Sequence, residues 1–412
     1  MNGSKSLNIN RPKLWTKNFV IDSVTNTIVY LVYFLLMVTI TAYTMDNLQA
    51  SPSEGGLACG IFILGALISR IFTGRSIDRV GRKRVLYIGL IFYLITTLFY
   101  FVITKLLVLI IIRFLQGAAF GVSATATGTI VASLIPNERR GEGTSYYAMS
   151  TTLASAIGPL MGMSLYQHGN FEFILYLSIC LLTVGLIAVF FLKVPEIKLT
   201  YEQLERTKAF ALNNFFESRA IPISLIAAII GLAYSSVLSF LSSYTREIDL
   251  VEAGSLFFLV FSIIILVSRP ATGRWFDQKG ENFVMYPCFI FFALGLIVLS
   301  QTYNGFVLLL AAAFVGLGYG TFLSCAQAIS VKVSPPYRMG LATSTYFCLL
   351  DAGIGIGPFL LGFLIPWIGF RWLYISMSFV VLVCILLYYF LHGKKAIRTQ
   401  SGNFYNQQKQ LG

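Results

Sequence analysis

Apolar runs of helical length, separated by short polar segments, recur along the whole chain. The runs are continuous rather than alternating, which excludes a membrane β-barrel, and each suits a bilayer-crossing helix of about 20 residues. Twelve runs are expected, at residues 18–43, 55–73, 85–104, 106–133, 143–167, 171–192, 220–245, 253–272, 283–302, 305–333, 340–366 and 371–391. The pattern therefore predicts an all-α integral membrane protein with 12 transmembrane helices. The first run is too long for a cleavable signal peptide and lacks a small-residue cleavage site.

One charged segment, residues 193–219, interrupts this pattern and separates six runs from six. Its stretch PEIKLTYEQLERTKAF suits a short amphipathic helix on the membrane face. The predicted divisions are a cytoplasmic N-terminal tail (1–17), an N-terminal six-helix bundle (18–192), a cytoplasmic central loop (193–219), a C-terminal six-helix bundle (220–391) and a cytoplasmic C-terminal tail (392–412).

Composition narrows the class of protein further. Of the 412 residues, 57% are hydrophobic and only 11% are charged, with a mean hydropathy of +0.77. Soluble domains contain about 25% charged residues. Twelve spans leave only short loops, so a separate soluble catalytic domain of about 100 residues is excluded.

The net charge of +13 indicates topology rather than nucleic-acid binding. Lysine and arginine gather in the tails, the central loop and the loops near residues 75–84 and 139–140, whereas the opposite loops hold only Lys105, Arg246 and Arg371. By the positive-inside rule, both termini and the central loop are expected in the cytoplasm. We therefore expect a multi-pass protein of the cell membrane that works as a monomer.

Neither a metal nor a cofactor is expected. The six cysteines lie in apolar runs without paired spacing, and His168 and His392 have no neighbours at ligand spacing. No GxxxxGK[ST] loop is present, so we do not expect this chain to use ATP. An enzyme would need clustered nucleophile, base or metal ligands, and none is found in the sequence.

The two halves of the chain repeat each other at a constant shift of 199 residues. The repeat pairs Gly74, Asp78 and Gly81 with Gly273, Asp277 and Gly280, Ser69–Arg70 with Ser268–Arg269, Gly117 and Gly121 with Gly316 and Gly320, Arg139 and Gly141 with Arg338 and Gly340, and Gly158–Pro159 with Gly357–Pro358. One gapless shift predicts two equivalent six-helix bundles, with a substrate site between them near the midplane.

The most informative motif is GRSIDRVGRKR at residues 74–84, between the second and third runs. Gly74 permits close helix approach, Asp78 places an anion among basic residues, and Gly81 permits a tight turn. A loop that only set the topology would explain the basic residues, but neither these three positions nor their repeat.

This loop resembles the cytoplasmic signature between helices two and three of the major facilitator superfamily. The resemblance to that superfamily extends over about residues 14–390. RFLQGAAFG at 113–121 is similar to the helix-four motif of proton-coupled members, and ASAIGPLMG at 154–162 is similar to the helix-five motif of the 12-helix drug:proton antiporters. Ala154 and Met163 depart from the glycines of that last pattern, and the first run lacks the prolines common in such exporters.

The resemblance implies alternating access and a cytoplasmic gate in the 74–84 loop, which in the outward state grips the start of helix eleven near residues 338–340. The gate residues are Gly74, Asp78, Arg79, Gly81, Arg82 and Lys83. The resemblance also links Arg113 to proton coupling.

Three charges within apolar runs are the candidates for proton coupling: Asp351, Arg113 and Asp22. An arginine near a helix centre costs about 2.5–3.5 kcal/mol on insertion scales, so Arg113 should face a cavity or a partner unless it reaches the membrane surface. A lone deep carboxylate such as Asp351 suits loading and release of a proton, although contacts with the backbone or Tyr346 are an alternative. Asp22 could equally remain in the headgroup zone.

Polar residues at helical spacing after Asp22 predict a cavity-facing stripe on the first span. The candidate substrate-cavity residues are Asn26, Tyr30, Gln116, Tyr319 and Gln327. Gly158 and Pro159 are expected to bend the fifth helix, with a static kink as the alternative. The glycines at 117, 121, 316 and 320 are expected to allow tight helix packing.

These features favour a secondary transporter that exchanges inward protons for an outgoing lipophilic or amphipathic small molecule. A proton-coupled importer of a sugar, osmolyte or organic acid keeps the same fold and reverses the direction. A membrane sensor or integral-membrane enzyme is the third hypothesis.

Overall fold

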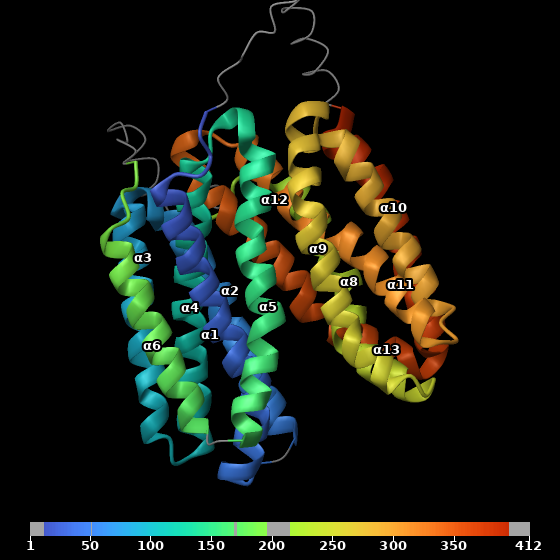
Figure 1. Ribbon diagram of the computed structural model, residues 1–412, viewed down its shortest axis with the longest axis horizontal. Coiled ribbons are helices and arrows are strands. Elements are labelled where there is room, and N and C mark those ends of the chain that lie inside the picture. Colours follow the sequence, from blue (N-terminus) through green and yellow to red (C-terminus); the bar gives the residue numbers. More distant parts are fainter. Residues whose placement is uncertain (1–11, 51, 169–170, 196–214, 395–412) are drawn as a thin grey trace, which may run out of the picture.

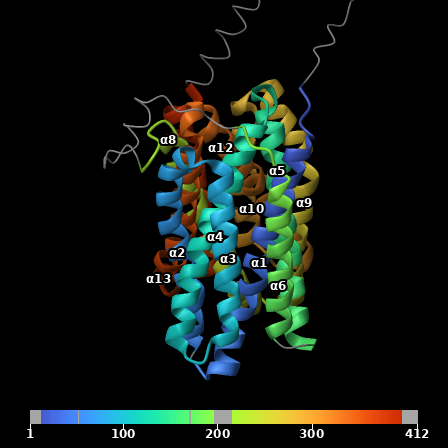
Figure 2. The same cartoon turned by 90° about the vertical axis from the view of Figure 1, so that its left-hand side faces the viewer.

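The computed structural model describes residues 12–50, 52–168, 171–195 and 215–394, and these form two helical halves side by side (Figure 1). In Figure 2 the N-terminal half faces the reader. The amphipathic helix expected in the central loop, and most of both tails, lie outside the described residues.

Six long helices make up the N-terminal half. They are α1 (Lys17–Leu48), α2 (Pro52–Val80), α3 (Arg82–Leu98), α4 (Leu106–Leu134), α5 (Arg140–His168) and α6 (Phe171–Phe190), with short 3₁₀ turns η1 (Phe99–Val102) and η2 (Asn137–Arg139). The Thr16 side chain caps α1 by accepting a hydrogen bond from the Phe19 amide at 3.2 Å.

The C-terminal half repeats the arrangement with two π-helical turns. Its elements are α8 (Ile221–Glu247), α9 (Val251–Lys279), α10 (Glu281–Ser300), α11 (Gly305–Val315), the π turn η4 (Gly316–Gly320), α12 (Thr321–Lys332), the 3₁₀ turn η5 (Pro336–Arg338), α13 (Met339–Tyr388) and the π turn η6 (Tyr389–Gly393). Gly369, with φ 72°, breaks α13 into two spans. Together α11, η4 and α12 form one span.

The described part contains eleven helices long and apolar enough to cross a membrane. Helix α5, of 29 residues, is a further long helix whose serine, threonine and glycine content lowers its hydropathy. The predicted all-helical membrane fold is thereby confirmed, with eleven candidate spans and α5 as a further long helix. Large apolar side chains on the outer surface, such as Trp367 at 87% exposure and Phe190 at 72%, match a lipid surround.

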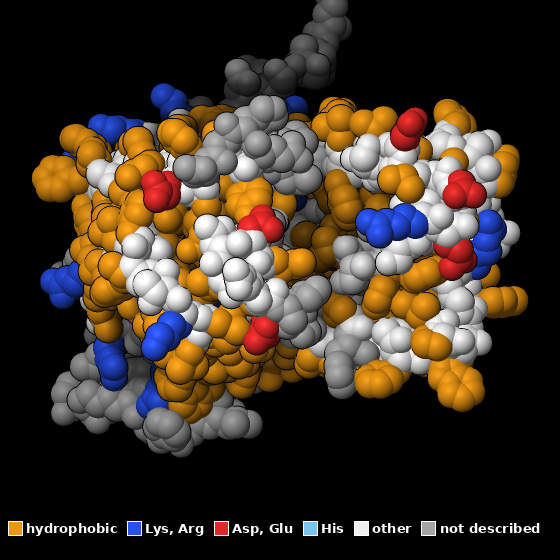
Figure 3. All heavy atoms as spheres, turned by 90° about the horizontal axis from the view of Figure 1, so that it is seen from below, with side chains coloured by type: hydrophobic (Ala, Val, Ile, Leu, Met, Phe, Trp, Pro, Cys, Tyr) orange, Lys and Arg blue, Asp and Glu red, His pale blue; other side chains and the backbone are white. Residues whose placement is uncertain are grey.

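At the upper end in Figure 1, α3 and α5 begin and α9 ends, and we call this end the basic end because of the lysine and arginine residues at these helix termini. It carries Lys17, Arg82, Arg140, Lys279 and Arg338. There the halves touch, with α2 against α13 and α5 against α9. Seen from the opposite end, the surface is hollowed between the halves, with hydrophobic side chains around the recess (Figure 3).

Glycines permit close helix contacts within each half, as the sequence predicted. A Cβ on Gly117 would lie 2.0 Å from the Phe62 carbonyl oxygen, between α4 and α2. In the C-terminal half, a Cβ on Gly316 would lie 2.7 Å from the Phe261 carbonyl oxygen. Both distances are too short for any side chain, so these positions pack backbone against backbone.

We expect Gly117→Ala to lower the melting temperature of the purified transporter. The added methyl group would meet the Phe62 backbone, which can move only with α2, and overpacking of this kind costs about 1–3 kcal/mol. Gly60→Ala is the matched control, because no atom lies within 4 Å of a Cβ at Gly60. Equal melting temperatures for the two variants would contradict the close packing of α2 and α4.

Candidate functional site

The first contact between the halves at the basic end is made by Asp78 of α2. Its Oδ2 accepts a hydrogen bond from the Gly340 amide at 3.1 Å, and its Oδ1 accepts one from Arg82 Nε at 2.8 Å. Arg82 also reaches the other half, donating from Nη2 to the Pro336 carbonyl at 3.3 Å. Gly340 must lack a side chain here, because a Cβ would lie 2.2 Å from Ile77 Cγ2.

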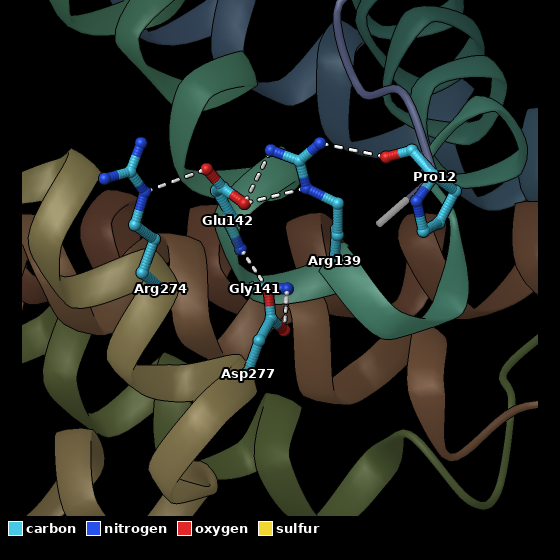
Figure 4. Close-up of polar contacts among 6 residues, drawn as sticks. All are labelled: Pro12, Arg139, Gly141, Glu142, Arg274 and Asp277. Atoms are coloured by element: carbon cyan, nitrogen blue, oxygen red, sulfur yellow. Dashed lines mark hydrogen bonds and ion pairs between the residues drawn. The ribbon is translucent and has the colours of Figure 1, made fainter. Parts of the chain in front are cut away.

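The second contact is the repeat of the first, with the halves exchanged (Figure 4). Asp277 of α9 accepts hydrogen bonds from the amides of Gly141 at 2.7 Å and Glu142 at 2.8 Å. The Glu142 carboxylate in turn pairs with Arg274 at 3.0 Å and with Arg139 at 2.8 Å.

Both contacts have the same physical basis, a carboxylate at a helix N-terminus. The first amides of a helix lack internal partners and carry the positive end of the helix dipole, so a carboxylate at that end is favourable. Asp78 caps the start of α13, and Asp277 caps the start of α5. We call this pair of contacts the double latch; it joins the halves at the basic end.

The remaining predicted gate residues have different surroundings. Gly74 lets α2 approach α13, since a Cβ there would lie 2.2 Å from Ser344 Cβ, and Gly81 makes the turn with φ 103°. Lys83 donates to the carbonyls of Phe190 at 3.1 Å and Leu192 at 2.7 Å, within its own half. Arg79 is exposed.

Deeper in the protein, an ion pair joins the halves. Arg70 of α2 lies with Nε 3.0 Å from Oδ2 of Asp351 of α13. The Arg70 side chain is 2% exposed and that of Asp351 is 25% exposed. The carboxylate is therefore the accessible partner, and the guanidinium is the enclosed one.

Aromatic side chains surround this pair. The Arg70 guanidinium lies 5.6 Å from the ring centroid of Phe120 and 4.9 Å from that of Phe347. Tyr30 and Tyr33 pack on Phe120 at 5.2 and 4.9 Å between ring centroids. The predicted cavity residue Tyr30 thus lies beside the Arg70–Asp351 pair, a neighbour that the sequence did not predict.

Arg113 lies elsewhere, enclosed in the N-terminal half. Nε donates to the Ala58 carbonyl at 2.9 Å, Nη1 donates to Gln116 Oε1 at 3.0 Å, and the guanidinium stacks 4.5 Å from the Phe62 ring centroid. Tyr100 also donates to Gln116 Oε1, at 2.7 Å. All these partners are neutral. Gln116 therefore holds Arg113, and the coupling role of Arg113 stays a prediction.

The polar stripe on α1 faces a second enclosed cluster. Asn26 donates to Ser150 Oγ at 2.7 Å and accepts from the Tyr147 hydroxyl at 2.8 Å and from Thr127 at 3.0 Å. Asp22 is 0% exposed, and neither carboxylate oxygen has a hydrogen-bond partner among the described residues. Asp22 is thus enclosed by the protein, and its coupling role stays a prediction.

In the C-terminal half, Tyr319 sits in the π turn η4 and stacks on Tyr234 with 3.8 Å between ring centroids. Gln327 of α12 lies across from α4, with Nε2 3.7 Å from a Cβ built on Gly128. Turns of the π type interrupt helices at functional positions more often than elsewhere.

Gly158 and Pro159 lie inside α5, which continues to His168. A Cβ on Gly158 would lie 2.5 Å from Phe34 Cβ, so α5 packs closely on α1 at this point. The repeat position, Gly357, also lies at a close helix contact, since a Cβ there would lie 2.0 Å from Ser235 Oγ. The bending role of both positions stays a prediction.

Sequence reasoning did not name Arg70, Arg269, Asp277 or Glu142 as site residues. The signal for three of them was present, because the 199-residue shift relates Arg70 to Arg269 and Asp78 to Asp277. For Glu142 there was no such signal, since its repeat position holds Leu341.

Comparison with known proteins agrees with this architecture. The sequence model described as Major Facilitator Superfamily matches residues 23–347 and 223–407. The chain is 23% identical to the staphylopine export protein of Staphylococcus aureus, over 83% of this chain and 88% of that protein. It is 24% identical to multidrug resistance protein 2 of Bacillus subtilis, over 69% of this chain and 73% of that protein. The crystal structure of human MFSD10, an organic anion transporter, superposes with a TM-score of 0.75 at 16% identity, covering 92% of this chain and all of that one.

Proposed function

The chain belongs to the major facilitator superfamily and is a multi-pass secondary transporter, and from this premise we propose that it is a proton-coupled exporter of small amphipathic compounds. The observation that carries the proposal is the Arg70–Asp351 ion pair, which joins the two halves inside the membrane.

The pair supports proton coupling through its geometry. Asp351 is accessible while Arg70 is enclosed, and the hollow opens at the end opposite the double latch. A proton that enters from that side can bind the Asp351 carboxylate and remove its charge. The ion pair to Arg70 is then lost, and with it one link that holds this conformation.

The proposed cycle follows from the loss of that link. With Asp351 protonated, the halves separate at the basic end and close at the opposite end, which exposes the site to the cytoplasm. The proton leaves to the cytoplasm, cargo binds, and the ion pair re-forms as the double latch closes. We place the basic end in the cytoplasm on the positive-inside rule.

Two features support export of amphipathic cargo. The names of the relatives in S. aureus and B. subtilis describe export and multidrug resistance. The surroundings of the ion pair are aromatic, with Tyr30, Tyr33 and Phe120 on one side, and such a surface suits cargo with an apolar body.

Inverted membrane vesicles containing the transporter test the direction and the coupling together. We expect dansyl probes to accumulate in vesicles with an acidic lumen and to leave when nigericin collapses the pH gradient. Suitable probes are dansylglycine, dansylglycinamide and dansylcadaverine, which are anionic, neutral and cationic. Vesicles from cells without the transporter are the control.

Loss of probe from acid-loaded inverted vesicles, with accumulation in right-side-out vesicles, would instead establish an importer. Accumulation that follows a sodium gradient and ignores pH would contradict proton coupling.

A further inference from the structure

Arg269 of α9 is an enclosed arginine that forms no ion pair with a described residue. Its side chain is 3% exposed, and Nε and Nη1 have no hydrogen-bond partner among the described residues. Among the described residues, its ionisable neighbours are Cys325 and Tyr346, and neither is a carboxylate. The Tyr346 hydroxyl is already used, because it donates to the Leu323 carbonyl at 2.8 Å. A charge left in such a position is costly unless a partner arrives.

Comparison with Arg70 shows what is missing. The 199-residue shift relates Arg269 to Arg70, and each lies ten residues before the end of its helix. Arg70 has Asp351 at 3.0 Å, but the shift relates Asp351 to Thr152. Thr152 is neutral, and its hydroxyl donates to the Ala148 carbonyl of its own helix. The repeat of the ion pair therefore keeps its guanidinium, Arg269, but has the neutral Thr152 in place of the carboxylate.

The position of Arg269 fits a central binding site. It lies one helical turn from Gly273, where α9 meets α5 and a Cβ would lie 2.7 Å from Ser145 Oγ. That contact closes the basic end. Along α9 from this contact toward the hollow, Arg269 is the first charged residue. Tyr346, beside Arg269, lies on α13 five residues before Asp351, so both charges neighbour the same helix.

We propose that Arg269 is the binding residue for an anionic group, a carboxylate, on the transported compound. The planar guanidinium offers parallel N–H donors that match two carboxylate oxygens, and the bound anion supplies the missing counter-ion. The cargo would then be an amphipathic acid, with its apolar body against the aromatic side chains. The assignment of the anion as cargo rests on the proposed function, whereas its binding at Arg269 does not.

Binding to the purified transporter tests this directly. We expect the wild-type protein to bind dansylglycine about 10-fold or more tightly than dansylglycinamide, in line with a charge-assisted contact. Arg269→Gln should remove the preference, and Arg269→Lys should keep part of it. Arg246→Gln, at an exposed arginine of α8, is the matched control and should keep the full preference.

A thermal readout separates binding from folding. Without ligand, Arg269→Gln should melt at a higher temperature than the wild type, because an unpaired enclosed charge is removed. Dansylglycine should raise the melting temperature of the wild type and leave that of Arg269→Gln unchanged.

The proposal is overturned if Arg269→Gln retains the preference for dansylglycine, if the wild type shows none, or if the variant melts at a lower temperature. Its failure is distinct from failure of the proposed export. Proton-driven accumulation of all three probes, unaffected by Arg269→Gln, would keep the exporter and reject the anion site. Arg269-dependent binding without any proton-driven accumulation would keep the anion site and reject the proton-coupled exporter.

Discussion

Asp351→Asn is expected to abolish proton-driven accumulation of the dansyl probes in inverted vesicles while the protein remains in the membrane. Asparagine has nearly the same shape as aspartate but cannot take up and release a proton, so the Arg70 link no longer responds to pH. The variant should still exchange probe for probe across the membrane without a gradient, because that reaction needs substrate binding and reorientation only.

The same substitution should lower stability. Breaking an enclosed ion pair by removing one partner costs about 3–5 kcal/mol, and we expect the lower end because the Asp351 side chain is 25% exposed. Replacing Arg70 with glutamine as well should recover part of this loss, since no enclosed charge is then left unpaired.

Asp46→Asn is the matched control for Asp351→Asn. Asp46 lies near the end of α1 and accepts from the Tyr166 hydroxyl at 2.6 Å, away from the ion pair. This variant should accumulate probe normally. If Asp351→Asn also retained full pH-driven accumulation, Asp351 would have no part in coupling.

The second large effect is expected from opening the double latch. In the variant with both Asp78→Asn and Asp277→Asn, neutral amides replace the carboxylates at two helix N-termini. Each such charge contributes about 0.3–2 kcal/mol, so loss of both should shift the population away from the closed basic end by about 10-fold. Transport should slow because this conformation is visited less, while dansylglycine affinity should change little.

Labelling of a cysteine at position 344 reports the latch directly. Ser344 is 1% exposed at the contact with Gly74, so a membrane-impermeant maleimide should modify Ser344→Cys slowly when the latch is intact and faster in the double variant. Asp249→Asn, at the turn after α8, is the control and should leave labelling unchanged. A loss of dansylglycine affinity as large as the loss of transport would contradict a gating role.

At the closed basic end, the sequence repeat predicts the equivalent aspartates but not every residue of the contacts. The shift of 199 residues identified Asp78 and Asp277 as equivalent, and the family resemblance placed the first near the start of helix eleven. That Asp277 performs the same task on α5 follows from the repeat once the first contact is seen. The contribution of Glu142 could not be predicted, because it depends on how Arg139 and Arg274 meet from opposite halves.

For the three charges within the apolar runs, the sequence did not predict the surroundings. Arg113, Asp351 and Asp22 were selected alike, as charges in apolar runs, yet their surroundings differ. Arg113 has neutral hydrogen-bond partners, Asp351 has Arg70, and Asp22 has none among the described residues. The partners come from residues tens to hundreds of positions away, so helical spacing alone could not rank the three.

The sequence by itself determined the helical membrane fold, its division into two halves and the end at which basic residues gather. These follow from hydropathy, charge distribution and an internal repeat, which depend on composition and order along the chain. Only the tertiary structure decided which charges meet. Among the described residues, Arg70 faces an acid and Arg269 faces none, because pairing depends on helix packing between the halves. Two equivalent arginines in one repeat look identical until their neighbours are known.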